Sequence, residues 1–491
     1  MSRSPDWLHY QAEVHPDRLA LMTEEGRWSF DNLDADVARF AGILSDLGIG
    51  RGDRVGYRLP ANAAQVILVH ALTRLGAVLV PLNTRLTARE LAPILDNADP
   101  ALIISDGAPF DWGTHQPKTR TMEALMETTS KRRVWDSTLN FDDLHALVYT
   151  SGTTGVPKGV EITVGNQWSS ALGFALNAGM LEQDRWLHVM PLFHVGGLTI
   201  LFRSVIHGSG VVLEPRFDAA RAYQLLQDER ITLLSVVPTM VHRLLELPGD
   251  APSLLRLALL GGAPAAPSLI DAAHRRGYPV VPTFGMTETC SQVVTLEKSE
   301  VPLRRGSSGH PNLPTRIRIA AGETDAPSGA IGEIWVQGPS VARGYWKNPE
   351  ATTAAFQNGW LKTGDLGFLD EDGYLTVTDR LKDLIIRGGE NVYPSEVEAA
   401  LLSHPGVADA AVFGQPDPEW GQIVAAAVVV SHSETPTSIQ NFLSKRLASY
   451  KMPSIYYRVE EIPRNASGKI LRARLQQDAS NLVKWVDSHD L

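Results

Sequence analysis

The chain of 491 residues lacks most features that mark disulfide-rich, membrane and nucleic-acid-binding proteins. Its one cysteine, Cys290, excludes an internal disulfide and a cysteine-ligated metal cluster, and favours a reducing compartment such as the cytoplasm. Residues 1–10 carry no apolar run, and no apolar run of 18 residues occurs, so we expect neither a signal peptide nor a membrane span. A formal net charge of -10 argues against a nucleic-acid partner.

The remaining composition is that of an ordinary globular protein, with 44% hydrophobic and 20% charged residues, and the length predicts two or three domains. Hydrophobic periodicity alternates between helix and strand from residue 31 to residue 105. The expected elements are a helix with Asp31 as N-cap, a strand at 55–59, a helix ending at Gly76, a strand at 77–82, a helix at 87–97 and a strand at 101–105. This order predicts a parallel sheet covered by helices, with ligands beyond the strand ends. We expect residues 107–141 to form a surface connection.

Residues 149–160 form the most informative stretch, a loop rich in hydroxyl groups and glycine that ends in Lys158. Glycine lets backbone N–H groups approach a polyanion closely, and hydroxyls and a lysine add further donors. The loop is therefore either a phosphate-binding loop or a polar hairpin turn. The Walker pattern fits poorly, because Lys158 is followed by glycine and valine instead of a hydroxyl residue. The candidate phosphate ligands are Thr150, Ser151, Gly152, Thr153, Thr154 and Lys158.

Arg203 is the only formally charged residue between positions 191 and 206, in a segment predicted to form a helix that is buried all round. A buried guanidinium group needs a partner, because leaving it unpaired costs several kcal/mol. The partner is either an anionic ligand or a structural Asp or Glu.

Two further strands are predicted to run into polar loops. The strand at 257–260 leads into Gly261, Gly262 and Ala263, and the strand at 280–283 leads into residues 284–289. Glu288 is either a Mg²⁺ ligand beside the phosphate loop or the acidic residue of a helix N-terminus.

A charged break at 378–383 predicts a domain boundary. We expect an N-terminal domain over residues 1–379 and a C-terminal domain over 384–491. The predicted fold is α/β, with a large N-terminal region of helix-flanked sheets and a small C-terminal α+β domain.

In order along essentially the whole chain, these motifs resemble the superfamily of adenylate-forming enzymes, which includes acyl- and aryl-CoA synthetases. The resemblance implies that the hydroxyl-rich loop holds the phosphates of ATP, that Thr287 and Glu288 serve the α-phosphate and Mg²⁺, and that residues 261–263 lie along the adenine. It adds Phe284, Gly285 and Met286 to the nucleotide site. Asp365 and Arg380 match positions that bind the ribose hydroxyls.

The resemblance makes Lys469 the catalytic lysine of the first half-reaction. A carboxylate that attacks the α-phosphorus of ATP brings negative charge to an anionic centre, which a positioned cation and Mg²⁺ stabilise. Considered alone, the sequence around Lys469 favours a solvated lysine in a Ser-Gly turn.

The superfamily also moves its small domain between two half-reactions. The resemblance therefore implies a mobile C-terminal domain over 384–491 and a hinge at 380–383, with Lys382 as the hinge residue. Gly388 and Gly389 then leave space for the pantetheine arm of CoA. Trp420, Tyr450 and Lys451 match CoA-contacting positions, whereas Met452 and Ser454 replace residues that are often basic. His194 matches a gate of the thiol channel, although a packed structural histidine fits equally well.

Within the superfamily, segments 182–187, 191–195, 286–292 and 358–367 are most similar to the 2-succinylbenzoate–CoA ligases of menaquinone biosynthesis. The implied reaction joins 2-succinylbenzoate to CoA through an acyl-adenylate and releases AMP and pyrophosphate. Arg203 would then bind the second carboxylate of the acid. Ser235, Thr239, Ser291 and Gln292 are its candidate polar neighbours, with His194 nearby.

Other functions remain compatible with the sequence. They are a CoA ligase for another aryl or medium-chain acid, an adenylation protein that serves a carrier-protein thiol, and a nucleotide-binding regulator or scaffold. The expected small molecules are ATP, Mg²⁺ and CoA, with no nucleic acid or membrane insertion, and a homo-oligomer is compatible with the chain.

Overall fold

A computed structural model of the chain describes residues 3–108, 118–135, 138–150, 157–263, 265–322, 324–387, 390–418, 420–431, 434–465, 468–479 and 482–485. The chain divides into two compact units. The first contains residues 1–261, 267–317 and 336–362, and the second contains residues 262–266, 318–335 and 363–491.

The first sheet confirms the predicted alternation of strand and helix. Its order is β10-β9-β5-β4-β6-β7, and it is parallel except for the pair of β9 and β10. The strands are β4 (Arg54–Arg58), β5 (Val78–Pro81), β6 (Leu102–Ser105), β7 (Thr119–Thr121), β9 (Leu144–Thr150) and β10 (Lys158–Thr163). The intervening helices are α3 (Ala63–Leu75), α4 (Ala88–Ala98) and α5 (Met122–Glu127).

Two details of this region differ from the sequence-based expectation. Helix α2 (Phe30–Asp46) has Ser29, not Asp31, as its N-cap, because the Ser29 hydroxyl accepts a hydrogen bond from the backbone N–H of Asn32. Asp31 instead lies in the first turn, where a negative charge is still favourable. Residues 107–141 are more than a connection, since they contain β7, α5 and strand β8 (Thr138–Asn140), which pairs with β1 (Arg3–Pro5) beside α1 (Trp7–Val14).

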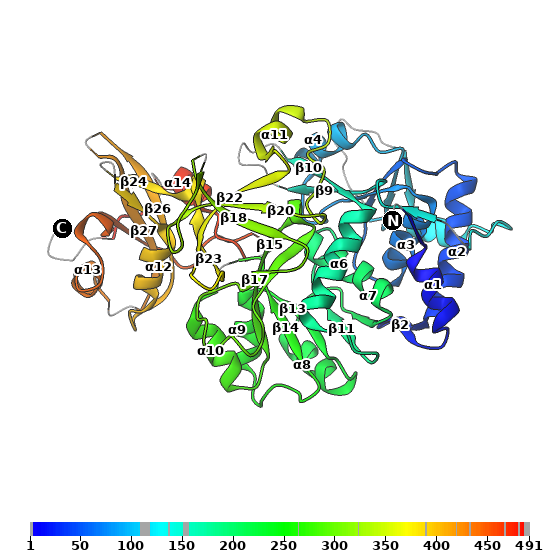
Figure 1. The fold of residues 1–491 in the computed structure, drawn as a ribbon, viewed down its shortest axis with the longest axis horizontal. Helices are drawn as coiled ribbons and strands as arrows, with labels where there is room; N and C mark the ends of the chain where they lie inside the picture. Colours follow the sequence, from blue (N-terminus) through cyan, green and yellow to red (C-terminus); the bar gives the residue numbers. More distant parts are fainter. Residues whose placement is uncertain are drawn as a thin grey trace. The chain divides into compact units, whose positions relative to one another are not determined.

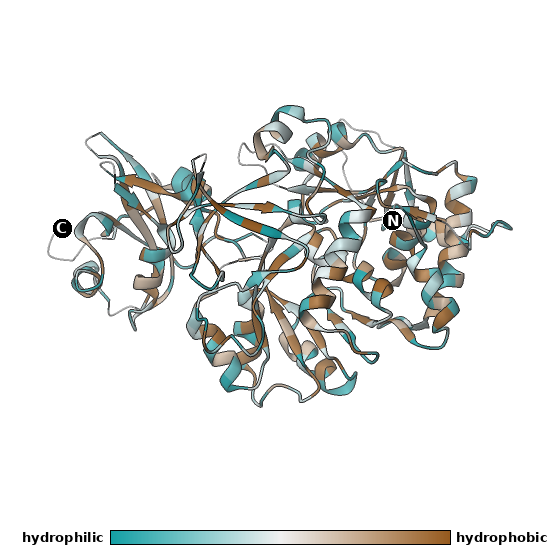
Figure 2. Cartoon of the chain, viewed as in Figure 1, coloured by the Kyte–Doolittle hydropathy of each residue, from teal (hydrophilic) through white to brown (hydrophobic). Residues whose placement is uncertain are grey.

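The second sheet has the order β17-β16-β15-β14-β13-β11-β12-β2-β3 and is parallel from β15 to β2. Figure 1 shows helices α8, α9 and α10 beside β13 and β14, and Figure 2 shows apolar colouring along these strands. The strands are β2 (Leu19–Thr23), β3 (Gly26–Ser29), β11 (Arg185–His188), β12 (Gly210–Leu213), β13 (Leu233–Val236), β14 (Leu257–Leu260), β15 (Val280–Met286), β16 (Ser291–Thr295) and β17 (His310–Pro311). The helices are α6 (Val164–Ala178), α7 (Val195–His207), α8 (Ala219–Asp228), α9 (Pro238–Glu246), α10 (Pro267–Arg275) and the 3₁₀ turn η1 (Thr287–Thr289).

A third sheet has the order β19-β18-β20-β22-β21, with β23 paired to β22. Its strands are β18 (Arg316–Ala321), β19 (Thr324–Asp325), β20 (Gly332–Gln337), β21 (Phe356–Gln357), β22 (Trp360–Leu369) and β23 (Leu375–Arg380), accompanied by helix α11 (Pro349–Ala355).

The fourth sheet, with order β25-β24-β27-β26 and β28 paired to β27, belongs to the small α+β region. Its strands are β24 (Ile385–Arg387), β25 (Glu390–Val392), β26 (Val407–Asp417), β27 (Gly421–Val430) and β28 (Ile455–Arg458). The helical segments are η2 (Leu381–Asp383), α12 (Pro394–Leu402), α13 (Pro436–Leu443), η3 (Ser449–Lys451) and α14 (Arg472–Asp478). Alternate residues of β26 and β27 pack on α12 and α13, which gives this region its own core.

Within the described part of the chain, no helix is both long enough and apolar enough to cross a membrane.

Candidate nucleotide and acid site

The two ends of the hydroxyl-rich loop lie opposite one another on neighbouring strands. Thr150 ends β9, Lys158 begins β10, and the two residues are partners in the antiparallel register. The predicted ligands Ser151, Gly152, Thr153 and Thr154 lie outside the described residues. The loop therefore joins the two strands of a β-hairpin. The prediction of phosphate binding rests on the residues in the loop and not on the way in which it joins the strands.

Glycine at position 159 lets the two strands of this hairpin pack closely. A Cβ atom on Gly159 would lie 2.9 Å from Cζ of the Tyr149 ring. The Tyr149 hydroxyl donates a hydrogen bond to Oδ1 of Asn97 at 2.7 Å, which fixes the ring against α4. The hairpin base is thus held to the helix layer beside it.

Glu288 lies in η1, where it is 6% exposed. Its Oε1 accepts a hydrogen bond from the Tyr345 hydroxyl at 2.8 Å. Burial, together with the adjacent carboxylate, raises the pKa of Tyr345, so its phenol stays neutral and donates. The alternative prediction, that Glu288 is the acidic residue of a helix N-terminus, also agrees with the structure, because Glu288 lies in the first turn of η1.

The chemistry of this donor set fits Mg²⁺. In the described residues no cluster of three or more His, Cys, Asp or Glu side chains could form an all-protein cage. Mg²⁺ commonly binds one or two carboxylates together with substrate phosphates, and a single buried glutamate matches that mode.

The turn between β15 and β16 brings the predicted nucleotide and acid ligands together. Phe284, Gly285 and Met286 end β15, and Gly285 pairs with Gln292 while Met286 pairs with Ser291. A Cβ on Gly285 would clash with the carbonyl oxygen of Ser291, so only glycine fits there. Cys290 and Ser291 have φ of 52° and 84°, which is strained for residues other than glycine.

Of the predicted adenine-binding residues, Gly261 follows β14 and donates its N–H to the carbonyl of Val236 at 3.1 Å. Gly262 has φ of 79°, a conformation that glycine adopts readily. Gly262 and Ala263 belong to the second unit, whereas Gly261 belongs to the first.

Within the second unit, the predicted ribose ligands and the predicted catalytic lysine form one cluster. Arg380 Nε lies 2.9 Å from Oδ1 of Asp365, which is 5% exposed. Burial lowers the pKa of Lys469 to about 8, with repulsion from Arg380 adding to the fall and attraction to Asp365 opposing it. Burial also raises the pKa of Asp365, although the positive charges of Arg380 and Lys469 act to lower it. Lys469 is therefore a half-buried cation beside an ion pair, which does not match a fully solvated lysine.

Arg203 is buried on α7, with 2% of its surface exposed. Its Nη2 donates to the hydroxyl of Ser170 at 3.1 Å, and its guanidinium carbon lies 5.1 Å from the ring centroid of Phe174. Among the described residues no Asp or Glu forms an ion pair with Arg203, and its Nε has no hydrogen-bond partner. Burial lowers the pKa of Arg203 to about 10, a value at which the group still carries its charge at neutral pH.

Sequence reasoning missed the buried residues of α6, two of which contact Arg203. Gln167, Ser170 and Phe174 share one face of α6, because positions i, i+3 and i+7 align on a helix. Gln167 is 1% exposed, and neither its amide nitrogen nor its amide oxygen has a partner. The buried Nε2 of Gln292 also lacks a partner. Buried polar groups are normally satisfied, so these atoms fit a polar ligand or bound water. The sequence did contain a signal for these residues of α6, namely polar side chains at helical spacing on an otherwise apolar face.

His194 is the N-cap residue of α7 and packs edge-on against Phe193, with ring centroids 4.7 Å apart. Burial lowers its pKa to about 4, so the ring is neutral. Ser235 is half-buried on β13, and Thr239 is exposed in the first turn of α9. No contact among the described residues joins Ser235 or Thr239 to Arg203, and their role in acid binding stays a prediction.

The predicted CoA contacts gather around Arg387 in the second unit. The Arg387 guanidinium lies 5.7 Å from the Trp420 ring centroid, and its Nη1 donates to the carbonyl of Tyr450 at 3.1 Å. Lys451 pairs with Glu396 at 2.6 Å. Gly388 and Gly389 lie outside the described residues.

The predicted hinge is tied to the small α+β region by acidic side chains on either side of Lys382. Oδ2 of Asp379 accepts hydrogen bonds from Ser395, the shorter being 2.6 Å from its hydroxyl. Arg472 lies 3.5 Å from Asp383 and donates to both carboxylate oxygens of Glu398 at 2.7 Å.

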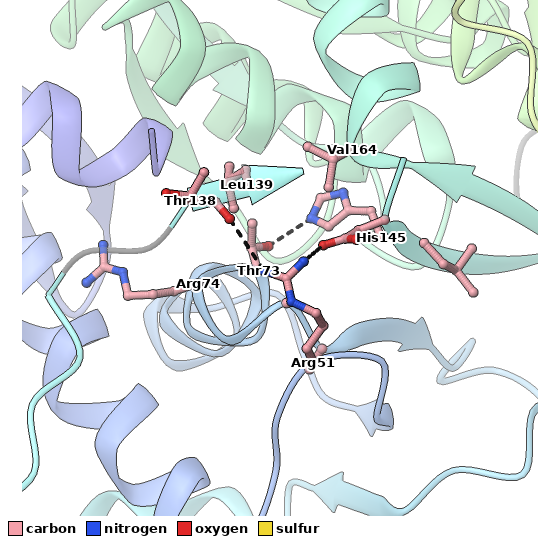
Figure 3. A pocket seen from close by; sticks show the side chains of 11 residues that line it. Arg51, Thr73, Arg74, Thr138, Leu139, His145 and Val164 are labelled. Atoms are coloured by element: carbon pink, nitrogen blue, oxygen red, sulfur yellow. Dashed lines mark hydrogen bonds and ion pairs between the residues drawn. The ribbon is translucent and has the colours of Figure 1, made fainter. Parts of the chain in front are cut away.

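A separate pocket lies beside β9, and none of the predicted ligands lines it (Figure 3). Thr73 Oγ1 and His145 Nε2 are 2.9 Å apart, and Arg51 pairs with Asp143. Burial lowers the pKa of His145 to about 3, which keeps its imidazole neutral. These pairs occupy the Thr73 hydroxyl and the Arg51 guanidinium, whereas the buried Nδ1 of His145 has no hydrogen-bond partner. Because none of the predicted ligands lines this pocket, it is not the candidate site.

Comparisons with known proteins agree with this geometry. Residues 8–346 match the AMP-binding enzyme family, and residues 396–469 match the AMP-binding enzyme C-terminal domain. The 2-succinylbenzoate–CoA ligase of Bacillus cereus (strain Q1) is 41% identical over 479 residues, covering 97% of this chain and 99% of that protein. The o-succinylbenzoate CoA synthetase (MenE) of Bacillus subtilis in complex with the acyl-adenylate intermediate is 40% identical, with a TM-score of 0.93 over 97% of this chain and 99% of that chain. The same enzyme in complex with ATP and magnesium ion gives a TM-score of 0.91 at 40% identity, over 96% and 99% of the two chains.

Proposed function

This chain belongs to the AMP-binding enzyme family, and from that membership we propose that it is an AMP-forming ligase that joins 2-succinylbenzoate to CoA in menaquinone biosynthesis. The observation that carries the choice of acid is Arg203, a buried cation with no carboxylate partner among the described residues. An acid with two carboxylates, one activated and one spectator, supplies the missing partner.

In the first half-reaction the succinyl carboxylate attacks the α-phosphorus of ATP and pyrophosphate leaves. The hydroxyl-rich loop with Lys158 holds the phosphates, Glu288 holds Mg²⁺, and Asp365 with Arg380 binds the ribose. Lys469 stabilises the charge that develops at the α-phosphate, and Thr287 binds the same phosphate. Bound Mg²⁺ supplies further neutralisation of that charge.

In the second half-reaction the CoA thiol attacks the acyl carbon and AMP leaves. No covalent enzyme intermediate is needed, because the adenylate itself is the activated acid. Rotation about the hinge at Lys382 moves Lys469 away from the reacting groups and brings the segment around Gly388 and Gly389 to them. His194 gates the thiol path, and Trp420, Tyr450 and Lys451 bind CoA.

Thioester formation with 2-succinylbenzoate, benzoate and octanoate tests the choice of acid. We expect turnover of 2-succinylbenzoate alone. Preference for benzoate or octanoate would leave a CoA ligase for another acid as the function. Absence of pyrophosphate release with every acid, in the presence of ATP and Mg²⁺, would favour a scaffold.

The cellular setting is also proposed. A ligase that consumes ATP and CoA fits the cytoplasm, and the single buried Cys290 fits a reducing compartment. A homo-oligomer remains compatible with the chain and can be tested by light scattering.

A further inference from the structure

Tyr345 connects two parts of the proposed nucleotide site that are far apart in the sequence. It lies between β20 and α11, and its hydroxyl donates to Oε1 of Glu288 at 2.8 Å. The Lys158 ammonium lies over the other part of the same side chain, 5.1 Å from the ring centroid. One residue thus touches both the proposed magnesium ligand and the lysine at the exit of the phosphate loop.

The backbone around Tyr345 fixes this arrangement. Tyr345 forms an isolated antiparallel bridge with Val160 of β10, and the N–H groups of Glu161 and Trp346 donate to Gly344 and Gly159 at 3.0 and 2.8 Å. Residues 344–346 therefore lie alongside β10, the edge strand of the first sheet. The N–H of Ala342 also donates to the backbone carbonyl of Glu288 at 2.8 Å.

The ring of Tyr345 is held from its other side as well. Its N–H donates to Oγ1 of Thr352 at 2.9 Å, and its ring meets Phe356 edge-on with centroids 5.8 Å apart. A side chain fixed at both backbone and ring can fix the direction of the carboxylate that it contacts.

We infer that Tyr345 is a positioning residue for adenylation: its hydroxyl orients the Glu288 carboxylate toward Mg²⁺, and its ring holds Lys158 at the phosphates. This inference rests on the proposed function for the identity of the nucleotide. It assigns to Tyr345 two separable contributions, one through the hydroxyl and one through the ring.

The physical expectation follows from each contact. Partners that orient a metal ligand typically contribute about 10- to 100-fold in metal affinity or activity. A cation over an aromatic face contributes independently of the hydroxyl, and phenylalanine preserves it. Tyr345→Phe should therefore affect only the Mg²⁺-dependent part of ATP binding, whereas Tyr345→Leu should weaken ATP binding without Mg²⁺ too.

The experiment measures ATP and AMP dissociation constants by calorimetry, in EDTA and at saturating Mg²⁺, and then the Mg²⁺ dependence of pyrophosphate release. For Tyr345→Phe we expect the gain in ATP affinity that Mg²⁺ provides to fall by about 10-fold or more. AMP affinity and melting temperature should stay at parent values. Tyr457→Phe is the matched control, because it removes a buried tyrosine hydroxyl that accepts a hydrogen bond from Gln415 at 2.8 Å in the second unit.

An unchanged Mg²⁺ dependence in Tyr345→Phe would overturn the inference, and so would an equal loss of AMP and MgATP affinity. Equal effects of the Phe and Leu variants on ATP binding in EDTA would overturn the role of the ring. These binding readouts need no acid, so they remain decisive even if the parent protein fails to activate 2-succinylbenzoate and the proposed function falls.

Discussion

At the scale of single residues, burial sets the charge that the site can use. Lys469 lies in the second unit beside Arg380 and Asp365, and burial lowers its pKa to about 8. The sequence identified Lys469 only through its family motif, because a lysine in a Ser-Gly turn has no local signal of burial. Likewise, an apolar helix predicted a buried Arg203. The polar spacing on α6 marks candidate partners, but which of them contact Arg203 depends on how the two helices pack.

The lowered pKa of Lys469 predicts how adenylation depends on pH. Only the protonated lysine stabilises the transition state, so pyrophosphate release at saturating ATP, measured without CoA, should fall as pH rises through about 8. Lys469→Arg should be slower but should lose this alkaline fall, because arginine stays charged. The same fall in Lys469→Arg as in the parent would assign the titration to another group.

At the scale of elements, local patterns predicted the parallel α/β layers well and the turns poorly. Strand 257–260 and helix 87–97 follow from hydrophobic periodicity, and both match the structure within about one residue. The N-cap at Ser29 and the short elements at 119–127 were missed, because caps and short pieces depend on individual hydrogen bonds and tertiary contacts.

The strained turn between β15 and β16 gives a prediction about stability. Glycine tolerates the φ of 84° at position 291, so Ser291→Gly should raise the free energy of unfolding by roughly 1 kcal/mol, net of the entropy cost of glycine. Ser291→Ala removes the same hydroxyl but keeps the strain, and it should not stabilise. Denaturant unfolding of both variants measures the difference; a glycine variant no more stable than the alanine variant would refute the strain. If Ser291 contacts the acid, both variants should raise KM for 2-succinylbenzoate.

At the scale of the whole molecule, the proposed movement of the C-terminal domain about its hinge separates the two half-reactions. A proline fixes φ near −65°, so Lys382→Pro should restrict rotation at the hinge. We expect the variant to retain pyrophosphate release within a few-fold and to lose most CoA-thioester formation, as measured by single-turnover assays of each step. Equal loss in both steps would place the hinge elsewhere.

The central claim, that Arg203 binds the spectator carboxylate of 2-succinylbenzoate, is tested most directly by comparing two acids. The second acid, 3-benzoylpropanoate, lacks only the carboxylate on the ring. Loss of a buried charge partner should cost roughly 2 to 5 kcal/mol, or about 30-fold to several thousand-fold in kcat/KM. The parent should prefer 2-succinylbenzoate by that factor, and Arg203→Ala should accept both acids nearly equally. A preference that is the same in the parent and in a folded Arg203→Ala variant would contradict the account.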